Sequence, residues 1–145
     1  IITKTPSSDN TTIDTLKRFW TALGCKIKVM SPAGHDKILA NISHLPHITA
    51  TALVNANTRK DLEFAGKGFF DTSRIASGPE NIWSDILMAN TSNIVGGIDK
   101  LILELLKLQK AVLSEDKKEV EKLLKSARDK RASMINYKLK NEELL

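Results

Sequence analysis

The sequence predicts a mainly α-helical protein that begins with a short strand–helix–strand unit. Three observations lead to this fold class. Apolar side chains recur at helical spacing over most of the chain after residue 31, and two short segments before that residue have the pattern of strands. The apolar residues are largely Leu, Ile and Ala, and only 5% of the residues are aromatic. With 145 residues, the chain can form one ordinary domain, or a small domain together with a fragment of another.

The first 31 residues are expected to form the strand–helix–strand unit. A short strand is predicted over residues 1–5, and a helix follows the capping residues 8–11 and ends at Gly24. Residues 25–30 alternate between apolar and polar side chains, which predicts a second strand. A single unit of this kind cannot bury both faces of its sheet. We therefore expect residues 1–31 to be the trailing end of a larger α/β domain, with Cys25 as a small core residue.

Residues 32–145 are expected to form five or six helices. The predicted helices cover residues 35–57, a turn near 62–64, a segment starting at 77–80, a long helix over 94–112 and a last amphipathic helix over 120–134. The segment 66–74 has no clear period. The apolar stripe of residues 94–112 is unusually wide, which predicts a helix that is buried on several sides and a chain that forms a homodimer.

Two histidines with a proline between them mark a candidate site. His44 and His47 are three residues apart, so they project from the same side of a helix. In a plain helix interior, Pro46 would destabilise the helix by about 3 kcal/mol and would leave the carbonyl of Ile42 unpaired. Strain of that kind collects at functional sites, which favours a ligand site that includes Ser43. A purely structural role for the histidines stays open. A metal site is not favoured, because helical zinc pairs are four residues apart and no further ligand has suitable spacing.

A second stretch adds groups suited to an anion. Gly68 lets the backbone approach a ligand closely, and the guanidinium of Arg74 can bind a carboxylate through two parallel hydrogen bonds. The alternative for Arg74 is a surface ion pair with Asp71, three residues away. Trp83 could form the wall of a pocket or fill a core. Together the two stretches predict a site for an anionic small molecule.

These residues resemble a known family. Ser-His-Leu-Pro-His at 43–47, Gly-x-Gly-Phe-x-Asp-x-x-Arg-Ile-Ala at 66–76 and a tryptophan nine residues after the arginine are similar to prephenate dehydrogenase and its arogenate and cyclohexadienyl dehydrogenase relatives. The resemblance implies that residues 1–31 end a truncated Rossmann-type dinucleotide-binding domain. It also implies that residues 32–145 form a helical substrate-binding and dimerisation domain. The implied reaction is the oxidative decarboxylation of prephenate to 4-hydroxyphenylpyruvate with NAD or NADP, in tyrosine biosynthesis.

The resemblance also implies roles for individual residues. His47 matches a histidine of the substrate pocket, and Arg74 matches the arginine that holds a prephenate carboxylate. Trp83 lies near the pocket in the family, and Asp71 lies at its mouth, where subunits meet. The other residues of the matching motifs are Ser43, His44 and Gly68. The chain departs from the family at Lys67, where a glycine is frequent, and at Phe70, where a basic residue is frequent.

The resemblance places the catalytic histidine in an N-terminal domain outside this chain. The sequence has no Gly-x-Gly-x-x-Gly motif, so its cofactor-binding residues are unidentified and the chain alone is expected to be inactive. An arogenate dehydrogenase, another dehydrogenase acting on a hydroxy acid, and a non-catalytic helical dimerisation module remain alternatives. Although the net charge is +5, acidic residues are mixed with the basic ones and no stacking aromatics accompany them, so no nucleic-acid partner is expected. No membrane segment and a cytoplasmic location are expected.

Overall fold

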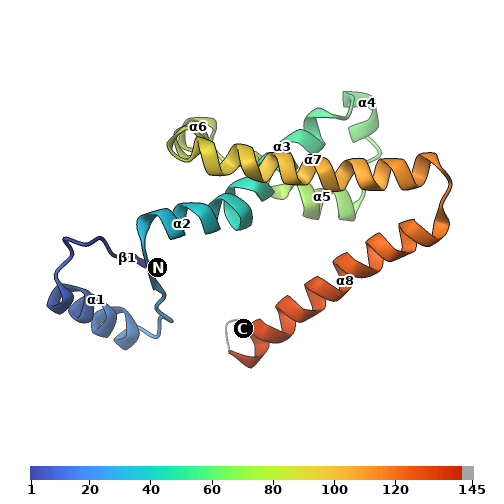
Figure 1. Cartoon of the computed structure of the whole chain (residues 1–145). Coiled ribbons are helices and arrows are strands. Elements are labelled where there is room, and N and C mark those ends of the chain that lie inside the picture. The colour runs from blue at the N-terminus through green and yellow to red at the C-terminus, as the bar shows by residue number, and fades with distance from the viewer. Residues whose placement is uncertain (142–145) are drawn as a thin grey trace. The chain divides into compact units, whose positions relative to one another are not determined.

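The computed structural model describes residues 1–141 and is mainly helical, as predicted (Figure 1). The chain divides into two compact units, Ile1–Ile98 and Asp99–Leu145. The division falls inside the long helix α7 (Thr91–Leu113), so each unit is described by itself. The predicted domain boundary between residues 31 and 32 stays a prediction.

The first unit begins with the predicted strand–helix–strand arrangement. Strand β1 (Ile2–Thr3) is followed by helix α1 (Asn10–Ala22) and strand β2 (Val29–Met30). The two strands are parallel, with Ile2 opposite Val29 and Thr3 opposite Met30. Both strands are shorter than predicted. Within the described residues each pairs only with the other, so no third strand adds hydrogen bonds that would lengthen them.

Local sequence signals set the ends of α1. The Asp9 carboxylate accepts a hydrogen bond from the backbone N–H of Thr12 at 2.8 Å, which caps the helix. Gly24 follows the helix with a φ of +80°, a conformation that favours glycine. The prediction that Cys25 is a core residue is wrong. Cys25 is exposed, because it precedes the short β2 strand and no element within residues 1–141 covers it.

The single helix predicted over residues 35–57 is three consecutive segments. Helix α2 (Pro32–Leu39) leads into a π-helical turn, η1 (Ala40–His44), and then into helix α3 (Leu45–Asn55). In η1 the backbone N–H of Leu45 donates to the carbonyl of Ala40, five residues back. Pro46 therefore lies in the first turn of α3, where a helix needs no N–H donor. The cost expected for Pro46 in a plain helix interior does not apply.

The glycine-containing segment is also more regular than predicted. Helix α4 (Arg59–Leu62) is followed by helix α5 (Lys67–Ser73), with Gly66 as its N-cap, and by a 3₁₀ helix, η2 (Arg74–Ser77). Helix α6 (Glu80–Ala89) comes next.

Helix α3 lies at the centre of the first unit, where it packs against η1, α5 and η2. The buried apolar residues are few and mostly small, including Ala40, Ala50 and Ile94. Close packing is clearest at Gly97, where an added Cβ would lie 3.7 Å from Asn41 and Leu45.

The second unit contains the rest of α7 and helix α8 (Lys117–Lys140). The wide apolar stripe of α7 is not buried within the chain. Leu103, Leu105 and Leu106 are each more than half exposed, and Val112 and Leu113 are more exposed still. The prediction that this helix is buried on several sides is therefore wrong for the single chain. Among residues 1–141, no helix combines the length and the apolar character needed to cross a bilayer.

Candidate functional site

A stack of two rings joins helices α3 and α6. The imidazole of His47 lies flat against the indole of Trp83, with ring centroids 3.5 Å apart and an angle of 9° between the planes. The ring of His44 stands edge-to-face to the same indole, with centroids 6.4 Å apart. His44 and His47 are both buried. The fold thus brings together three residues that the sequence predicted for the site. His44 and His47 are close in the chain, whereas Trp83 is far from both.

A cavity of about 520 Å³ adjoins this stack, and we call it the histidine pocket. Its polar lining comes from α3 and from the start of α6. The polar or aromatic residues that line it are His47, Thr51, Asn55, Glu80, Trp83 and Ser84. Within the described part of the chain, the Nδ1 atom of His47 is buried and has no hydrogen-bond partner. An unpaired buried nitrogen is costly, which is more typical of a functional site than of a packing core.

Gly78 is a residue of this pocket that the sequence reasoning did not identify. A Cβ built on Gly78 would lie 2.4 Å from Nε1 of Trp83 and 3.0 Å from Cε1 of His47. The φ of Gly78 is −64°, which any residue can adopt, so glycine is required here for space and not for backbone conformation. The signal in the sequence is the glycine directly before Pro79, in the segment 77–80 where a helix is predicted to start.

Burial favours the neutral form of both histidines. Loss of solvent lowers the pKa of His47, and it is also the largest cause of the lowered pKa of His44. The charge of His35 lowers the pKa of His44 further, whereas Asp36 acts in the opposite direction. Both rings are therefore neutral at pH 7, and each has one nitrogen that donates and one that accepts.

We expect the free energy of unfolding to decrease as the pH falls below about 6.5, the ordinary pKa of histidine. The unfolded chain binds protons on His44 and His47 at that pH, whereas the folded chain binds them only at lower pH. Protonation therefore favours the unfolded state between the ordinary and the lowered pKa. Urea denaturation at about pH 7.5, 6.5 and 5.5 measures this effect.

His47→Gln is the control for this pH series, because it should flatten the dependence. The carboxyl group of Asp9 stays ionised throughout this range, because hydrogen bonds from Thr11 and Thr12 lower its pKa to about 2. A wild-type stability that stays constant from pH 7.5 to 5.5 would contradict the lowered histidine pKa values.

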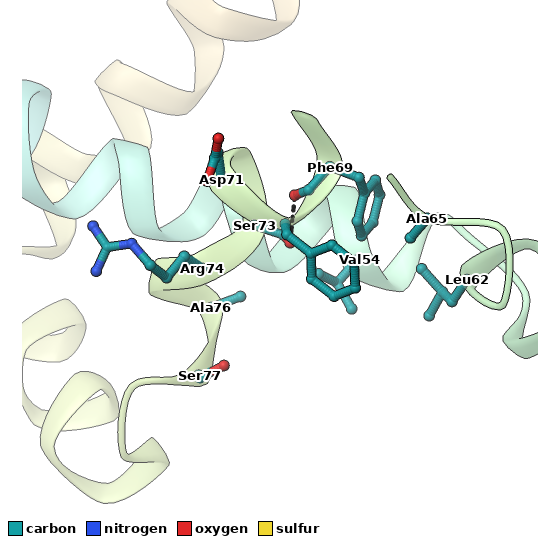
Figure 2. Close-up of a pocket in the computed structure, with 10 residues that line it drawn as sticks. Val54, Leu62, Ala65, Phe69, Asp71, Ser73, Arg74, Ala76 and Ser77 are labelled. Atoms are coloured by element: carbon teal, nitrogen blue, oxygen red, sulfur yellow. Dashed lines mark hydrogen bonds between the residues drawn. The ribbon is translucent and has the colours of Figure 1, made fainter. Parts of the chain in front are cut away.

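Arg74 and Asp71 line a different cavity, also of about 520 Å³, which we call the arginine pocket. Figure 2 shows its apolar end, formed by Val54, Leu62 and Ala65, and the two charged side chains away from that end. Neither Arg74 nor Asp71 forms an ion pair or a side-chain hydrogen bond with another described residue. The alternative of an Asp71–Arg74 surface pair is therefore not observed, and the guanidinium of Arg74 is available to a ligand.

The structure does not merge the two groups of predicted residues into one cavity. Arg74 and Asp71 line the arginine pocket, His47 and Trp83 line the histidine pocket, and Ala76 of η2 lines both. The remaining predicted residues, Ser43, His44 and Gly68, line neither. Among the described residues, Ser43 forms no hydrogen bond with His47. A Cβ added at Gly68 would meet nothing within 4 Å, so space for a ligand is open there.

The described residues do not fit a dinucleotide or a metal. The connection between β1 and α1 contains no glycine, so no glycine-rich turn is present to hold a pyrophosphate at the N-terminus of α1. No group of three His, Cys, Asp or Glu residues within 1–141 is arranged to bind a metal ion.

Comparison with known proteins identifies the family. The sequence model described as "Prephenate dehydrogenase, dimerization domain" matches residues 31–126. The chain belongs to this family. It is 33% identical over 137 residues to the prephenate dehydrogenase of Bacillus subtilis, covering 90% of this chain and 37% of that protein. The chain thus spans well under half of that relative.

Two solved structures share the fold. The prephenate dehydrogenase of A. aeolicus, in complex with hydroxyphenyl propionate and NAD⁺, is 31% identical with a TM-score of 0.84, over 91% of this chain and 48% of that one. The arogenate dehydrogenase of Synechocystis is 26% identical with a TM-score of 0.80, over 91% of this chain and 50% of that one.

Proposed function

We propose that this chain is the C-terminal, substrate-binding and dimerising part of an NAD- or NADP-dependent prephenate dehydrogenase. The enzyme would convert prephenate to 4-hydroxyphenylpyruvate in tyrosine biosynthesis, in the cytoplasm. The observation that carries the proposal is the guanidinium of Arg74, which lies at the edge of a cavity and has no ion-pair partner among residues 1–141, in a chain that belongs to the prephenate dehydrogenase family.

Arg74 is assigned to a carboxylate of the substrate. Prephenate carries two carboxylates, and a guanidinium binds such a group through two parallel hydrogen bonds. Because Arg74 has no acidic partner within the described residues, binding a carboxylate does not require an existing ion pair to break. Asp71 lines the same pocket and is assigned to its mouth, with Gly68 leaving space in the same helix.

His47 and Trp83 are assigned to the wall of the substrate site. Their stack presents a rigid surface beside the histidine pocket, and Ala76 connects this pocket to the arginine pocket. Because burial lowers the pKa of His47, its imidazole is neutral, and it can donate or accept a hydrogen bond without adding a charge to the site. His44 supports this wall from η1 through its edge-to-face contact with Trp83, and Ser43 precedes it in the same turn.

Hydride transfer is assigned to residues outside this chain. The bound nicotinamide cofactor would accept the hydride, but the described residues do not fit its pyrophosphate. What these residues contribute is binding and orientation of the substrate, which can supply a large part of a rate enhancement. The 145-residue chain alone is therefore proposed to be inactive.

The exposed apolar stripe of α7 supports the proposed homodimer. Leu103 and Leu106 are three residues apart and share one side of the helix, Leu105 lies on the other side, and all three are more than half exposed in the single chain. The family match to a dimerization domain is consistent with a second copy covering them.

The proposal is tested by calorimetric titration with prephenate of this chain and of the intact enzyme that contains it, the latter with NAD present. The intact enzyme should bind prephenate, the chain alone should bind it weakly and turn none over, and both should sediment as dimers. Hydroxyphenyl propionate, which is bound in the A. aeolicus structure, serves as a second titrant. Binding of arogenate in place of prephenate would favour an arogenate dehydrogenase, the activity named for the Synechocystis relative. Absence of binding to any of them would contradict the proposal and favour a non-catalytic dimerisation module.

A further inference from the structure

Asn90 is a buried polar residue at the junction of α6 and α7 that neither the family motifs nor the pockets include. Its side chain reaches two other parts of the first unit. The Nδ2 atom lies 2.7 Å from the backbone carbonyl oxygen of Asp36 in α2 and 3.4 Å from Nδ1 of His44 in η1. The Oδ1 atom lies 2.8 Å from Nδ2 of Asn93.

The chemistry of these partners fixes the orientation of the Asn90 amide. The carbonyl of Asp36 can only accept a hydrogen bond, so the NH₂ group of Asn90 must face it. The Oδ1 atom then faces the NH₂ group of Asn93, which can donate to it. The opposite orientation would place two acceptors together at Asp36 and two donors together at Asn93.

This orientation constrains the tautomer of His44. One N–H of the Asn90 amide donates to Asp36, which leaves the second N–H directed at Nδ1 of His44. A hydrogen on Nδ1 would oppose that N–H across 3.4 Å, whereas a lone pair on Nδ1 accepts from it. Burial, which disfavours a charged imidazole, leaves the neutral ring with its single hydrogen on Nε2.

We propose that Asn90 is a positioning residue that holds His44 in the Nε2–H tautomer, with the ring edge-to-face against Trp83. Among the described residues, Nε2 of His44 has no hydrogen-bond partner, and it is not one of the buried unpaired atoms. His44 therefore presents a neutral N–H donor, suited to an oxygen acceptor of a ligand. This consequence for binding rests on the proposed function, but the tautomer does not.

The tautomer is measured directly by long-range ¹H–¹⁵N correlation NMR of the ¹⁵N-labelled 145-residue chain at pH 7.5. Its three histidines are assigned with His35→Gln and His47→Gln variants. The expected result is a protonated Nε2 and an unprotonated Nδ1 for His44. In Asn90→Asp the new carboxylate only accepts, so the neutral His44 ring should carry its single hydrogen on Nδ1 instead of Nε2, and its pKa should rise. His35 and Asp36, which already affect the titration of His44, are unchanged in this variant.

Asn93→Ala is the matched control, since it removes the partner of Oδ1 and leaves the Nδ2 contacts of Asn90 in place. It should keep the wild-type tautomer. A proton on Nδ1 in the wild-type chain would overturn the proposal, and this measurement holds even if a variant fails to fold. An unchanged tautomer in a folded Asn90→Asp would also overturn it.

A second readout separates this inference from the proposed function. In the intact enzyme with NAD, Asn90→Asp should raise the KM for prephenate by about three- to tenfold, the loss of one hydrogen bond, and leave kcat nearly unchanged. The expected tautomer together with an unchanged KM would remove His44 from the substrate site while the assignment of Asn90 stands.

Discussion

Arg74→Ala in the intact enzyme should raise the KM for prephenate by about 10- to 100-fold and change kcat much less. Hydrogen bonds to a charged group contribute about 1.5–3 kcal/mol, which corresponds to this range of affinity. The effect is expected on KM because the guanidinium is assigned to a carboxylate that does not react at the hydride-transfer step, so it would bind the ground state and the transition state alike. Steady-state kinetics with prephenate as the varied substrate, and calorimetry with hydroxyphenyl propionate, measure the change.

Two further variants make this result specific. Arg74→Lys keeps the charge but loses the paired hydrogen-bond geometry, so it should recover only part of the affinity. Arg59→Ala removes another exposed arginine, in α4, that lines neither pocket, and it should leave the KM unchanged. A KM for Arg74→Ala equal to that of the wild type would remove Arg74 from the substrate site.

Gly78→Ala should lower the free energy of unfolding by about 1–3 kcal/mol, the cost of inserting a methyl group into a well-packed region. The new Cβ would lie 2.4 Å from Nε1 and 2.7 Å from Cδ1 of Trp83 and 3.0 Å from Cε1 of His47, so the ring stack or the backbone at residue 78 must shift. The backbone of Gly78 is compatible with alanine, so the cost comes from the contact alone. Urea denaturation measures the stability, and tryptophan fluorescence in a Trp20→Phe background reports on the surroundings of Trp83.

Gly96→Ala is the control for this substitution. It lies within α7 and an added Cβ there meets no atom within 4 Å, so it should be neutral or stabilise by up to about 1 kcal/mol. The Gly78→Ala chain should also bind prephenate less tightly in the intact enzyme, since the ring stack forms the wall of the histidine pocket. Wild-type stability and unchanged Trp83 fluorescence in Gly78→Ala would show that the stack has room for the methyl group.

The sequence predicted much of the helical architecture because helix signals are local. The cap at Asp9, the glycine after α1 and the spacing of apolar residues depend on neighbours within a few positions. The same local reasoning failed at Pro46, because a π turn can move a proline from the interior of a helix to its first turn. It also failed at residues 67–73, where two glycines masked a short helix that is supported by packing against α3.

The candidate site, too, was predictable from the sequence only in part. The sequence by itself determined which residue types are present, namely two histidines one turn apart, an arginine beside glycines and a tryptophan nine residues later. Only the tertiary structure decided that Trp83 stacks on His47, that Gly78 leaves space for this stack and that Asn90 reaches His44 from the start of α7. It also placed Arg74 in a separate pocket from His47. These relations join residues that are far apart in the chain, and they depend on how α3, α6 and η2 pack, which no periodicity within one helix encodes.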